Sequence, residues 1–270
     1  MQALSGRFGF LGYGNMGGAI AAGLLAQEAL RSERLYVYDP DPTKMATAHG
    51  QGVQCADTPQ ALVAACDTLV LAVKPQALKE ALAPLGDLNT SELRVISIMA
   101  GISIATLQAH FGEQARIIRV MPNTPALVNA GASAIACSDT CSDADRADAQ
   151  AIFEAVGMAE IVPESHMDGV TALSGCGPAY FFYLTECLIA AAVAEGLPED
   201  TAQRLAGQTL LGAGRLLVSA DAPPSVLREQ VTSKGGATFA ALESLRAADF
   251  AATVQAAYKA AANRSKELGG

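Results

Sequence analysis

A glycine-rich segment near the start of the chain limits the possible folds more than any other feature. Phe8–Leu11 is an apolar run of the length of a buried strand, and an alanine-rich, helix-like run follows from residue 19 to residue 30. Between the two runs stand three glycines in G-x-G-x-x-G spacing, Gly12, Gly14 and Gly17. A strand, a tight turn and a helix in this order are the setting of a dinucleotide-binding site, although a plain tight turn has the same glycines.

Each of the three glycines has a separate role in such a turn. Gly12 permits the tight turn, Gly14 lets the backbone approach a pyrophosphate, and Gly17 lets the helix pack closely on the strand. The free N–H groups at the start of the helix then face the phosphates. We therefore expect a dinucleotide to bind here.

Composition and charge narrow the class of protein. The chain has 270 residues, of which 51 % are hydrophobic and 17 % charged, so it can bury a sizeable core in one large or two modest domains. Its net charge of −9 argues against nucleic acid or an anionic membrane as a partner. No uninterrupted apolar run of about 18 residues and no signal-peptide pattern occurs, so we expect a cytoplasmic location.

The six cysteines and three histidines do not suggest a metal site. They are scattered, no C-x-x-C pair occurs, and nothing completes a zinc ligand set around Cys137 and Cys141. We expect reduced, mostly buried thiols and no bound metal.

Strand-like and helix-like segments alternate in the first part of the chain. The expected strands are 8–11, 34–38, 68–73, 94–98, 116–120, 132–136 and 159–162. The expected helices are 16–29, 42–49, 59–65, 77–82, 104–111 and 142–156. This alternation predicts an α/β fold, a parallel sheet covered by helices on both faces, with ligands at the carboxyl ends of its strands.

After about Pro163 the pattern becomes helical. The expected helices are 166–173, 179–195, 198–219, 223–232, 236–244 and 249–268, with no convincing strand. The sequence thus predicts a dinucleotide-binding Rossmann domain over residues 1–163 and an all-α domain over 164–270. The alanine-rich second domain has the composition of a dimerisation unit.

Asp39 bears on the choice of cofactor. It ends the second expected strand, 22 residues after Gly17, where a carboxylate accepts hydrogen bonds from the ribose hydroxyls of NAD and repels the 2′-phosphate of NADP. The Asp-Pro-Asp-Pro run at 39–42 has another interpretation, because aspartate is also a preferred helix N-cap.

Other strand ends place polar or small residues at the same edge. Lys74 follows one strand and is either beside the nicotinamide or an ordinary surface lysine. Small residues at 100 and 101 allow a flat ring to lie against the backbone. Asn123 and Thr124 offer an amide and a hydroxyl to a substrate, or simply form a turn.

The segment Val231–Thr238 is the strongest candidate in the helical part. Two hydroxyls, on Ser233 and Thr238, surround two glycines at a helix start, and helix N–H groups there can bind a carboxylate. The alternative is a turn between helices with Ser233 as a cap. Ser174, before a Gly-Pro pair, similarly fits a capped helix start.

No proton donor stands out among these candidates. Reduction of a ketone or aldehyde creates an alkoxide and needs a general acid. Reduction of a protonated imine does not, because hydride transfer neutralises the cation. A hydroxyl for the nitrogen and a pocket for a carboxylate would suffice.

Taken together, the motifs resemble the Δ1-pyrroline-5-carboxylate reductase family, the last enzymes of proline biosynthesis. The matching segments span the chain: 10–20, 73–75, 97–101, 119–125, 131–133, 173–180 and 231–238. The resemblance implies an NAD(P)H-dependent oxidoreductase that acts on a CH–NH bond and forms L-proline. It further implies a Rossmann domain, a helical dimerisation domain, homodimers that assemble further into a ring such as a decamer, and an active site shared between subunits.

The resemblance also assigns residues. It implies that the Thr238 hydroxyl bonds the ring nitrogen and is catalytic. The residues implied to contact the substrate are Ser233, Gly235, Gly236, Ala237, Thr238 and, from its place at the sheet edge, Asn123. The residues expected to contact the cofactor are Gly12, Gly14, Asn15, Met16, Gly17, Asp39, Val73, Lys74, Pro75, Ala100 and Gly101.

Some residues depart from the family pattern. Cys176 stands where the family commonly has serine, and Lys234 where it commonly has proline. Asp39 and Pro59 replace neutral polar or basic residues near the ribose, so NADH is favoured although the family often prefers NADPH.

Two other functions fit parts of the sequence. A hydroxyacid dehydrogenase of similar architecture would need a catalytic lysine where Ser174 and Cys176 stand. A non-catalytic dinucleotide sensor would leave the Val231–Thr238 segment without a purpose.

Overall fold

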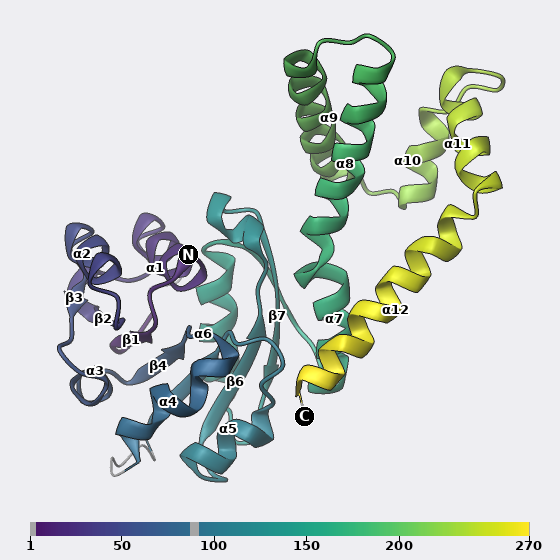
Figure 1. Ribbon diagram of the computed structural model, residues 1–270. Coiled ribbons are helices and arrows are strands. Elements are labelled where there is room, and N and C mark those ends of the chain that lie inside the picture. Colours follow the sequence, from purple (N-terminus) through teal and green to yellow (C-terminus); the bar gives the residue numbers. More distant parts are fainter. Residues whose placement is uncertain (1–3, 87–91, 270) are drawn as a thin grey trace. The chain divides into compact units, whose positions relative to one another are not determined.

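The computed structural model describes residues 4–86 and 92–269 and divides the chain into two compact units (Figure 1). One unit contains the chain up to Cys176 together with the segment from Ala261 onward, and the other is Gly177–Ala260. This division into units differs from the expected domain boundary at residue 163, and that boundary stays a prediction.

The first unit is built on an eight-stranded sheet in the order β3-β2-β1-β4-β5-β6-β7-β8. The strands are β1 Phe8–Leu11, β2 Leu35–Tyr38, β3 Gln54–Cys55, β4 Thr68–Leu71, β5 Arg94–Ser97, β6 Arg116–Met121, β7 Gly131–Cys137 and β8 Gly157–Ile161. Seven of these were predicted. No sequence pattern predicts β3, because this strand has only two residues and both are exposed.

Strand direction differs from the prediction at one edge. Strands β1 to β6 run parallel, but β7 is antiparallel to β6 and parallel to β8. The expected all-parallel sheet is therefore wrong here. The link between β6 and β7 holds only the short 3₁₀ turn Thr124–Val128. A parallel return needs a longer crossover, usually with a helix.

Helices cover both faces of the sheet. They are α1 Asn15–Ala26, α2 Pro42–Gly50, α3 Pro59–Ala65, α4 Leu78–Leu82, α5 Ile104–Phe111, α6 Asp143–Glu154 and α7 Met167–Val170. Buried side chains of α1, α2 and α6 form one core, and those of α3, α4, α5 and α7 form the other. Alternate strand residues serve the two cores, since Phe10 belongs to the first and Leu11 to the second. The predicted α/β fold is confirmed.

The described part of the second unit is entirely helical. It contains α8 Gly177–Ala194, α9 Glu199–Ser219, α10 Pro224–Gln230, α11 Ala237–Ala247 and the first half of α12, Phe250–Gly269. Helices α8 and α9 lie side by side, and Gly196, at φ +95°, permits the turn between them. All five predicted helices of this region are confirmed.

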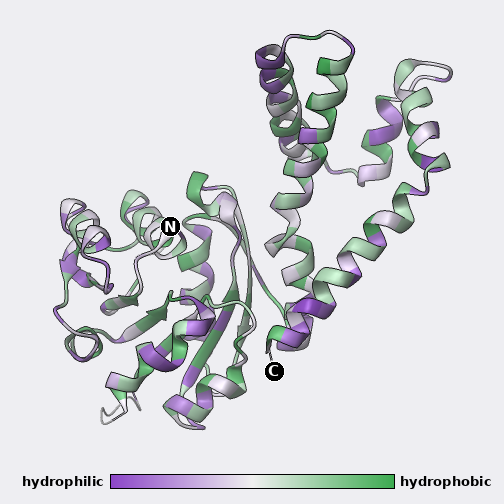
Figure 2. Cartoon of the chain, viewed as in Figure 1, coloured by the Kyte–Doolittle hydropathy of each residue, from purple (hydrophilic) through white to green (hydrophobic). Residues whose placement is uncertain are grey.

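Much of the apolar surface of the second unit is exposed. Tyr183 of α8 is 68 % exposed and Val218 of α9 is 89 % exposed, and Figure 2 shows hydrophobic residues along much of α8. Patches of this kind usually mark a surface that contacts another chain or a membrane. The helical stretch Glu164–Ala194, with a mean hydropathy of 1.4 in its most apolar window, is long and apolar enough to cross a membrane by length and composition. A single such helix is weak evidence, and a subunit contact accounts for the same surface.

Candidate active site

The sheet register brings the predicted cofactor residues to one edge. Leu11, the last residue of β1, pairs with Tyr38 on one side and with Leu71 on the other. Leu71 in turn pairs with Ser97, and Ser97 with Arg119. The residues that follow these strand ends therefore lie along the same carboxyl edge. The chain reverses its direction of travel across the sheet between β1 and β4, where doubly wound folds bind their ligands.

The three glycines of the loop differ in their surroundings. Gly12 has φ +99°, and an ideal Cβ on it would lie 2.7 Å from the carbonyl oxygen of Ala72. A Cβ on Gly17 would lie 2.8 Å from the carbonyl oxygen of Gly12. A Cβ on Gly14, by contrast, would meet nothing within 4 Å. Two glycines thus build the turn, and the third leaves open space in front of the backbone.

The first turn of α1 is available to an anion. Gly14 is the N-cap residue, and no side chain caps the helix. The first N–H groups of a helix lack partners within it, so a phosphate at this position would satisfy them. Asn15 and Met16 form the start of this turn, with Asn15 exposed and Met16 half-buried. The loop therefore fits the pyrophosphate of a dinucleotide.

Asp39 supports the same loop from the neighbouring strand. Its side chain is buried, with Oδ2 accepting from the N–H of Tyr13 at 2.7 Å and Oδ1 from that of Asp41 at 2.9 Å. The Lys44 ammonium lies 3.7 Å from Oδ2. The cap of α2 is Asp41, which accepts from the N–H of Thr43, so the interpretation of Asp39 as a helix cap is wrong.

Tyr13 is a supporting residue that the sequence motifs did not reveal. Its backbone N–H donates to Asp39. Its side chain is buried, and the phenol hydroxyl donates a 2.5 Å hydrogen bond to Gln51 Oε1. Burial raises the pKa of Tyr13 to about 12, so the hydroxyl stays a donor at neutral pH. In the sequence, only the position of Tyr13 between Gly12 and Gly14 pointed to a supporting role.

The next two strand ends place small and apolar residues at this edge. Val73 and Pro75 are half-buried between β4 and a short 3₁₀ turn, and Lys74 between them is exposed. After β5, Ala100 is exposed whereas Gly101 is buried and has φ +78°. All five residues thus border the same edge as the glycine loop.

Asn123 is occupied by hydrogen bonds to backbone. Its Nδ2 donates to the carbonyl oxygen of Ser174 at 3.0 Å, and its Oδ1 accepts from the N–H of Ala132 at 2.8 Å. The amide therefore ties the end of β6 to the start of β7 and to a helical turn fifty residues away. These bonds fit the interpretation of Asn123 as a structural amide, and its substrate contact stays a prediction.

Ser174 lies inside a helix rather than at its start. The turn Thr171–Gly175 is π-helical and follows α7 directly, and one residue, Cys176, separates it from the start of α8 at Gly177, so the interpretation of Ser174 as a cap is wrong. Its hydroxyl donates to the carbonyl oxygen of Val170 at 3.1 Å. π-Helical turns are rare in proteins, but those that occur are often found at functional sites. The half-buried free thiol of Cys176 follows directly.

In the second unit, Val231–Thr238 contains the turn before α11 and the first two residues of that helix, and most of its residues are exposed. Gly235 has φ +72°, and Gly236 is the N-cap residue of α11 with no side chain capping the helix. The interpretation of Ser233 as the cap is therefore wrong. The hydroxyl-bearing residues Ser233 and Thr238 are both exposed beside this uncapped helix start. An anionic group would find backbone N–H groups and hydroxyls together here.

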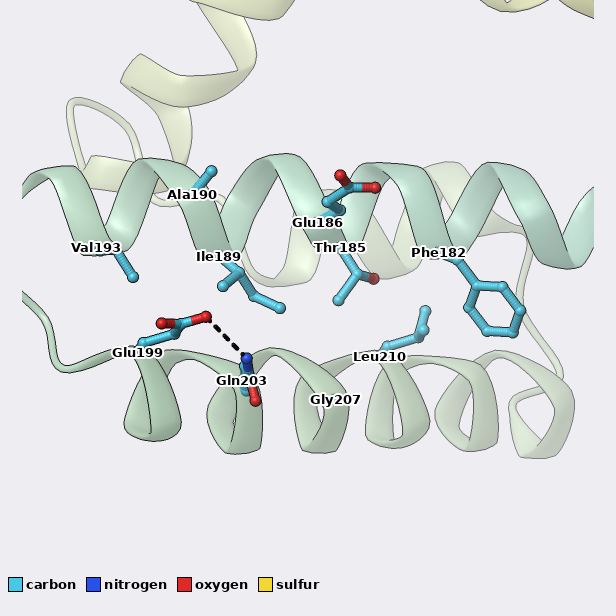
Figure 3. A pocket seen from close by; sticks show the side chains of 10 residues that line it. All are labelled: Phe182, Thr185, Glu186, Ile189, Ala190, Val193, Glu199, Gln203, Gly207 and Leu210. Atoms are coloured by element: carbon cyan, nitrogen blue, oxygen red, sulfur yellow. Dashed lines mark hydrogen bonds between the residues drawn. The ribbon is translucent and has the colours of Figure 1, made fainter.

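A groove in the second unit contains none of these residues. It lies between α8 and α9, has a volume of about 760 Å³ and is lined mainly by apolar side chains (Figure 3). Its polar residues include Glu199 and Gln203, which bond to each other. Across residues 4–86 and 92–269, no three His, Cys, Asp or Glu side chains gather as metal ligands would.

Two family profiles match the chain. Residues 164–268 match pyrroline-5-carboxylate reductase dimerisation, and residues 7–101 match NADP oxidoreductase coenzyme F420-dependent. The first match implies a homodimer, and the second agrees with nicotinamide dinucleotide binding by the sheet unit.

Full-length relatives extend these matches. The pyrroline-5-carboxylate reductase of Pseudomonas aeruginosa is 39 % identical over 264 residues, covering 97 % of this chain and 96 % of that protein. The pyrroline-5-carboxylate reductase structure from Coxiella burnetii has a TM-score of 0.93 at 34 % identity, covering 99 % and 100 % of the two chains. The structure of Plasmodium falciparum pyrroline carboxylate reductase with NADP bound has a TM-score of 0.88 at 32 % identity, and it also covers 99 % of this chain and 100 % of that chain.

Similarity to these reductases over the full length of the chain excludes the two alternative functions, a hydroxyacid dehydrogenase and a non-catalytic dinucleotide sensor. The reaction is the NAD(P)H-dependent reduction of 1-pyrroline-5-carboxylate to L-proline, the closing step of proline biosynthesis. This chain belongs to the pyrroline-5-carboxylate reductase family.

Proposed function

We propose that two separate loops of this reductase divide the reactants between them. The carboxyl edge of the sheet holds the cofactor, through Gly12, Gly14, Asn15, Met16, Gly17, Asp39, Val73, Lys74, Pro75, Ala100 and Gly101. The open space at Gly14 and the uncapped start of α1 support this assignment. When bound there, a reduced nicotinamide supplies the hydride.

The loop before α11 binds the substrate carboxylate. Ser233 contributes its hydroxyl, and Gly235, Ala237 and Thr238 contribute backbone N–H groups. The N–H of Gly236 already donates to the carbonyl oxygen of Ser233 at 3.0 Å, so Gly236 lines the site as the N-cap residue of α11. The observation that carries this proposal is the uncapped start of α11 beside two exposed hydroxyls. A carboxylate there would satisfy N–H groups that no side chain caps. The exposed Lys234 adds a nearby positive charge.

Thr238 also orients the reacting bond. Its hydroxyl bonds the ring nitrogen and so fixes which face of the imine is presented. The imine carbon accepts the hydride, and the electron pair of the C=N double bond moves to nitrogen, whose positive charge is thereby neutralised. Because the imine nitrogen is already protonated, the amine of proline forms directly, and the chain needs no general acid to protonate the nitrogen.

NADH is the preferred cofactor in this proposal. The buried Asp39 carboxylate is held by two N–H groups at the end of β2, where it can still accept from ribose hydroxyls. It would repel a 2′-phosphate at the same place, although Lys44 offsets part of the charge. The NADP bound in the structure of the Plasmodium falciparum relative argues against a preference for NADH.

The active site is shared between subunits, with the cofactor edge of one chain facing the substrate loop of its partner. Exposed apolar residues of the second unit support an extensive subunit contact. In this proposal residues 1–163 bind cofactor, residues 164–270 dimerise and bind substrate, and dimers assemble into a larger ring such as a decamer. The location is cytoplasmic. Light scattering coupled to size-exclusion chromatography tests the assembly, and a mass equal to one dimer would contradict the ring.

Steady-state kinetics with authentic pyrroline-5-carboxylate test the role of Thr238. Replacing Thr238 with alanine should lower kcat about 100-fold, because a hydrogen bond to the reacting atoms is lost. The Kd for NADH should stay unchanged. The matched variant Thr238→Ser keeps the hydroxyl and should keep most of the activity. Equal activity of Thr238→Ala and the unaltered enzyme would remove Thr238 from the mechanism.

A further inference from the structure

The last turn of α12 lies directly against the loop that follows β5. An ideal Cβ on Gly101 would be 3.2 Å from the carbonyl oxygen of Leu268, and one on Gly269 would be 3.0 Å from the carbonyl oxygen of Gly101. At both positions an added Cβ would require the neighbouring carbonyl to shift by a few tenths of an ångström, and at Gly101 the positive φ would strain any side chain as well. The two backbones are therefore in van der Waals contact.

A buried hydrogen bond anchors this turn. Ser265 is 5 % exposed and is the one buried residue among those described in α12. Its hydroxyl donates to Asp168 Oδ1 of α7 at 2.7 Å. The segment from Ala261 onward accordingly belongs to the compact unit that contains the sheet.

The loop that receives this contact needs external support. Gly101 has φ +78°, a conformation that costs glycine little but leaves the chain flexible. The hydroxyl of Ser97 accepts from the N–H of Met99 and so supports the beginning of the loop. The turn of α12 supports its end, at Gly101.

We propose that the last turn of α12 is a buttress that positions Ala100 and Gly101 against the bound cofactor, with Ser265 as its positioning residue. This inference rests on the proposed cofactor contacts of Ala100 and Gly101. Loss of the buttress lets the loop move away from its binding position, so cofactor affinity falls while the reacting groups on other elements are unchanged.

The Ser265→Ala variant tests the anchor in the full-length enzyme. It should raise the KM for NADH about fivefold, because misplaced contacts weaken binding, and leave kcat and the KM for pyrroline-5-carboxylate within about twofold. Asp168→Asn keeps the acceptor oxygen and should stay close to the unaltered enzyme, whereas Asp168→Ala should behave like Ser265→Ala. Ser219→Ala, which removes an exposed hydroxyl bonded within α9, is the matched control. A lowered Tm with an unchanged KM for NADH would show a merely structural anchor and overturn the inference.

A double-mutant cycle tests the contact itself. Gly101→Ala is made in the full chain and in a variant shortened after Arg264, which lacks the buttress. In the full chain the new methyl group meets the Leu268 carbonyl, so the rise in KM for NADH should be at least about threefold larger than in the shortened chain, where only backbone strain remains. Equal rises in the two backgrounds would overturn the buttress alone. An unchanged KM for NADH in both would instead refute the cofactor contact of Gly101, and the inference with it.

Discussion

The two loops proposed to form the active site are supported in opposite ways. The glycine loop is held by its own chain, through the Ala72 carbonyl behind Gly12 and the Asp39 carboxylate beside Tyr13, and it is open only at Gly14 among the three motif glycines. The Val231–Thr238 loop is exposed, and the helix behind it starts without a side-chain cap. In the proposed active site, the cofactor half is therefore formed within one subunit, whereas the substrate half is completed by the partner subunit and by the ligand.

This difference explains how a dimeric reductase can combine rigid and adaptable binding. A pyrophosphate is the same in every cofactor molecule and suits a rigid, preorganised loop. A small imino acid must enter and leave, and an exposed loop on a helical unit allows this.

The glycine loop gives the largest expected effect. Gly14→Ala should lower kcat/KM for NADH about 100-fold, because the added methyl group occupies the space left for the pyrophosphate. The Tm should stay unchanged, since that methyl group meets no atom of the chain. Gly50→Ala, also in open space but away from the loop, is the control. Unaltered kinetics of Gly14→Ala would mean that the loop is a plain turn.

Subunit complementation tests the sharing of the site. Gly14→Val and Thr238→Ala are each inactivating, and co-expressed subunits with different tags form mixed dimers. A shared site should restore about a quarter of full activity, because half of the dimers are mixed and each has one intact pair of loops. If each subunit carried a whole site, the mixed preparation would be no more active than its parents.

Asp39→Ser tests the cofactor preference. The ratio of kcat/KM for NADH to that for NADPH should fall about tenfold, because a repulsive charge near the 2′-phosphate is removed. Asp41→Ser, at the cap of α2, is the matched control and should leave the ratio unchanged. A constant ratio in Asp39→Ser would mean that the carboxylate serves only to hold Tyr13.

The smallest effect on catalysis is expected at the opposite edge of the sheet. Asp145 is buried and pairs with Arg116 at 3.1 Å and Arg94 at 3.3 Å. Burial raises its pKa, but hydrogen bonds from Ser142 and the two arginines outweigh burial and hold the pKa below its usual value. Asp145→Asn should cost about 3 kcal/mol of unfolding free energy and leave both KM values unchanged.

The pH dependence of this cost follows from the lowered pKa. A carboxylate with a lowered folded pKa contributes stability above its unfolded pKa and loses that contribution as pH falls through the folded pKa. The difference between Asp145→Asn and the unaltered enzyme should thus be full above about pH 5 and shrink in stronger acid. Urea unfolding across this range measures it, and a difference independent of pH would contradict the charge argument.

Several features could be read from the sequence because they depend on neighbours along the chain. Glycine spacing, apolar strands such as Phe8–Leu11 and the breaks between helices are local signals, and the predicted elements matched them. The two-residue strand β3 was not predicted, because neither of its residues is buried. The family itself was recognisable from motifs spread over the whole length.

Tertiary structure decided what these residues do. The direction of β7, the occupation of the Asn123 amide by Ser174 and Ala132, and the role of Asp41 rather than Asp39 as a cap all depend on groups whose positions the sequence pattern left open. The contact of Leu268 with Gly101 joins residues far apart in the chain. Local sequence determines which elements form because hydrogen bonds and apolar periodicity act over a few residues. Contacts between distant residues depend on how the completed elements pack, and no periodicity encodes them.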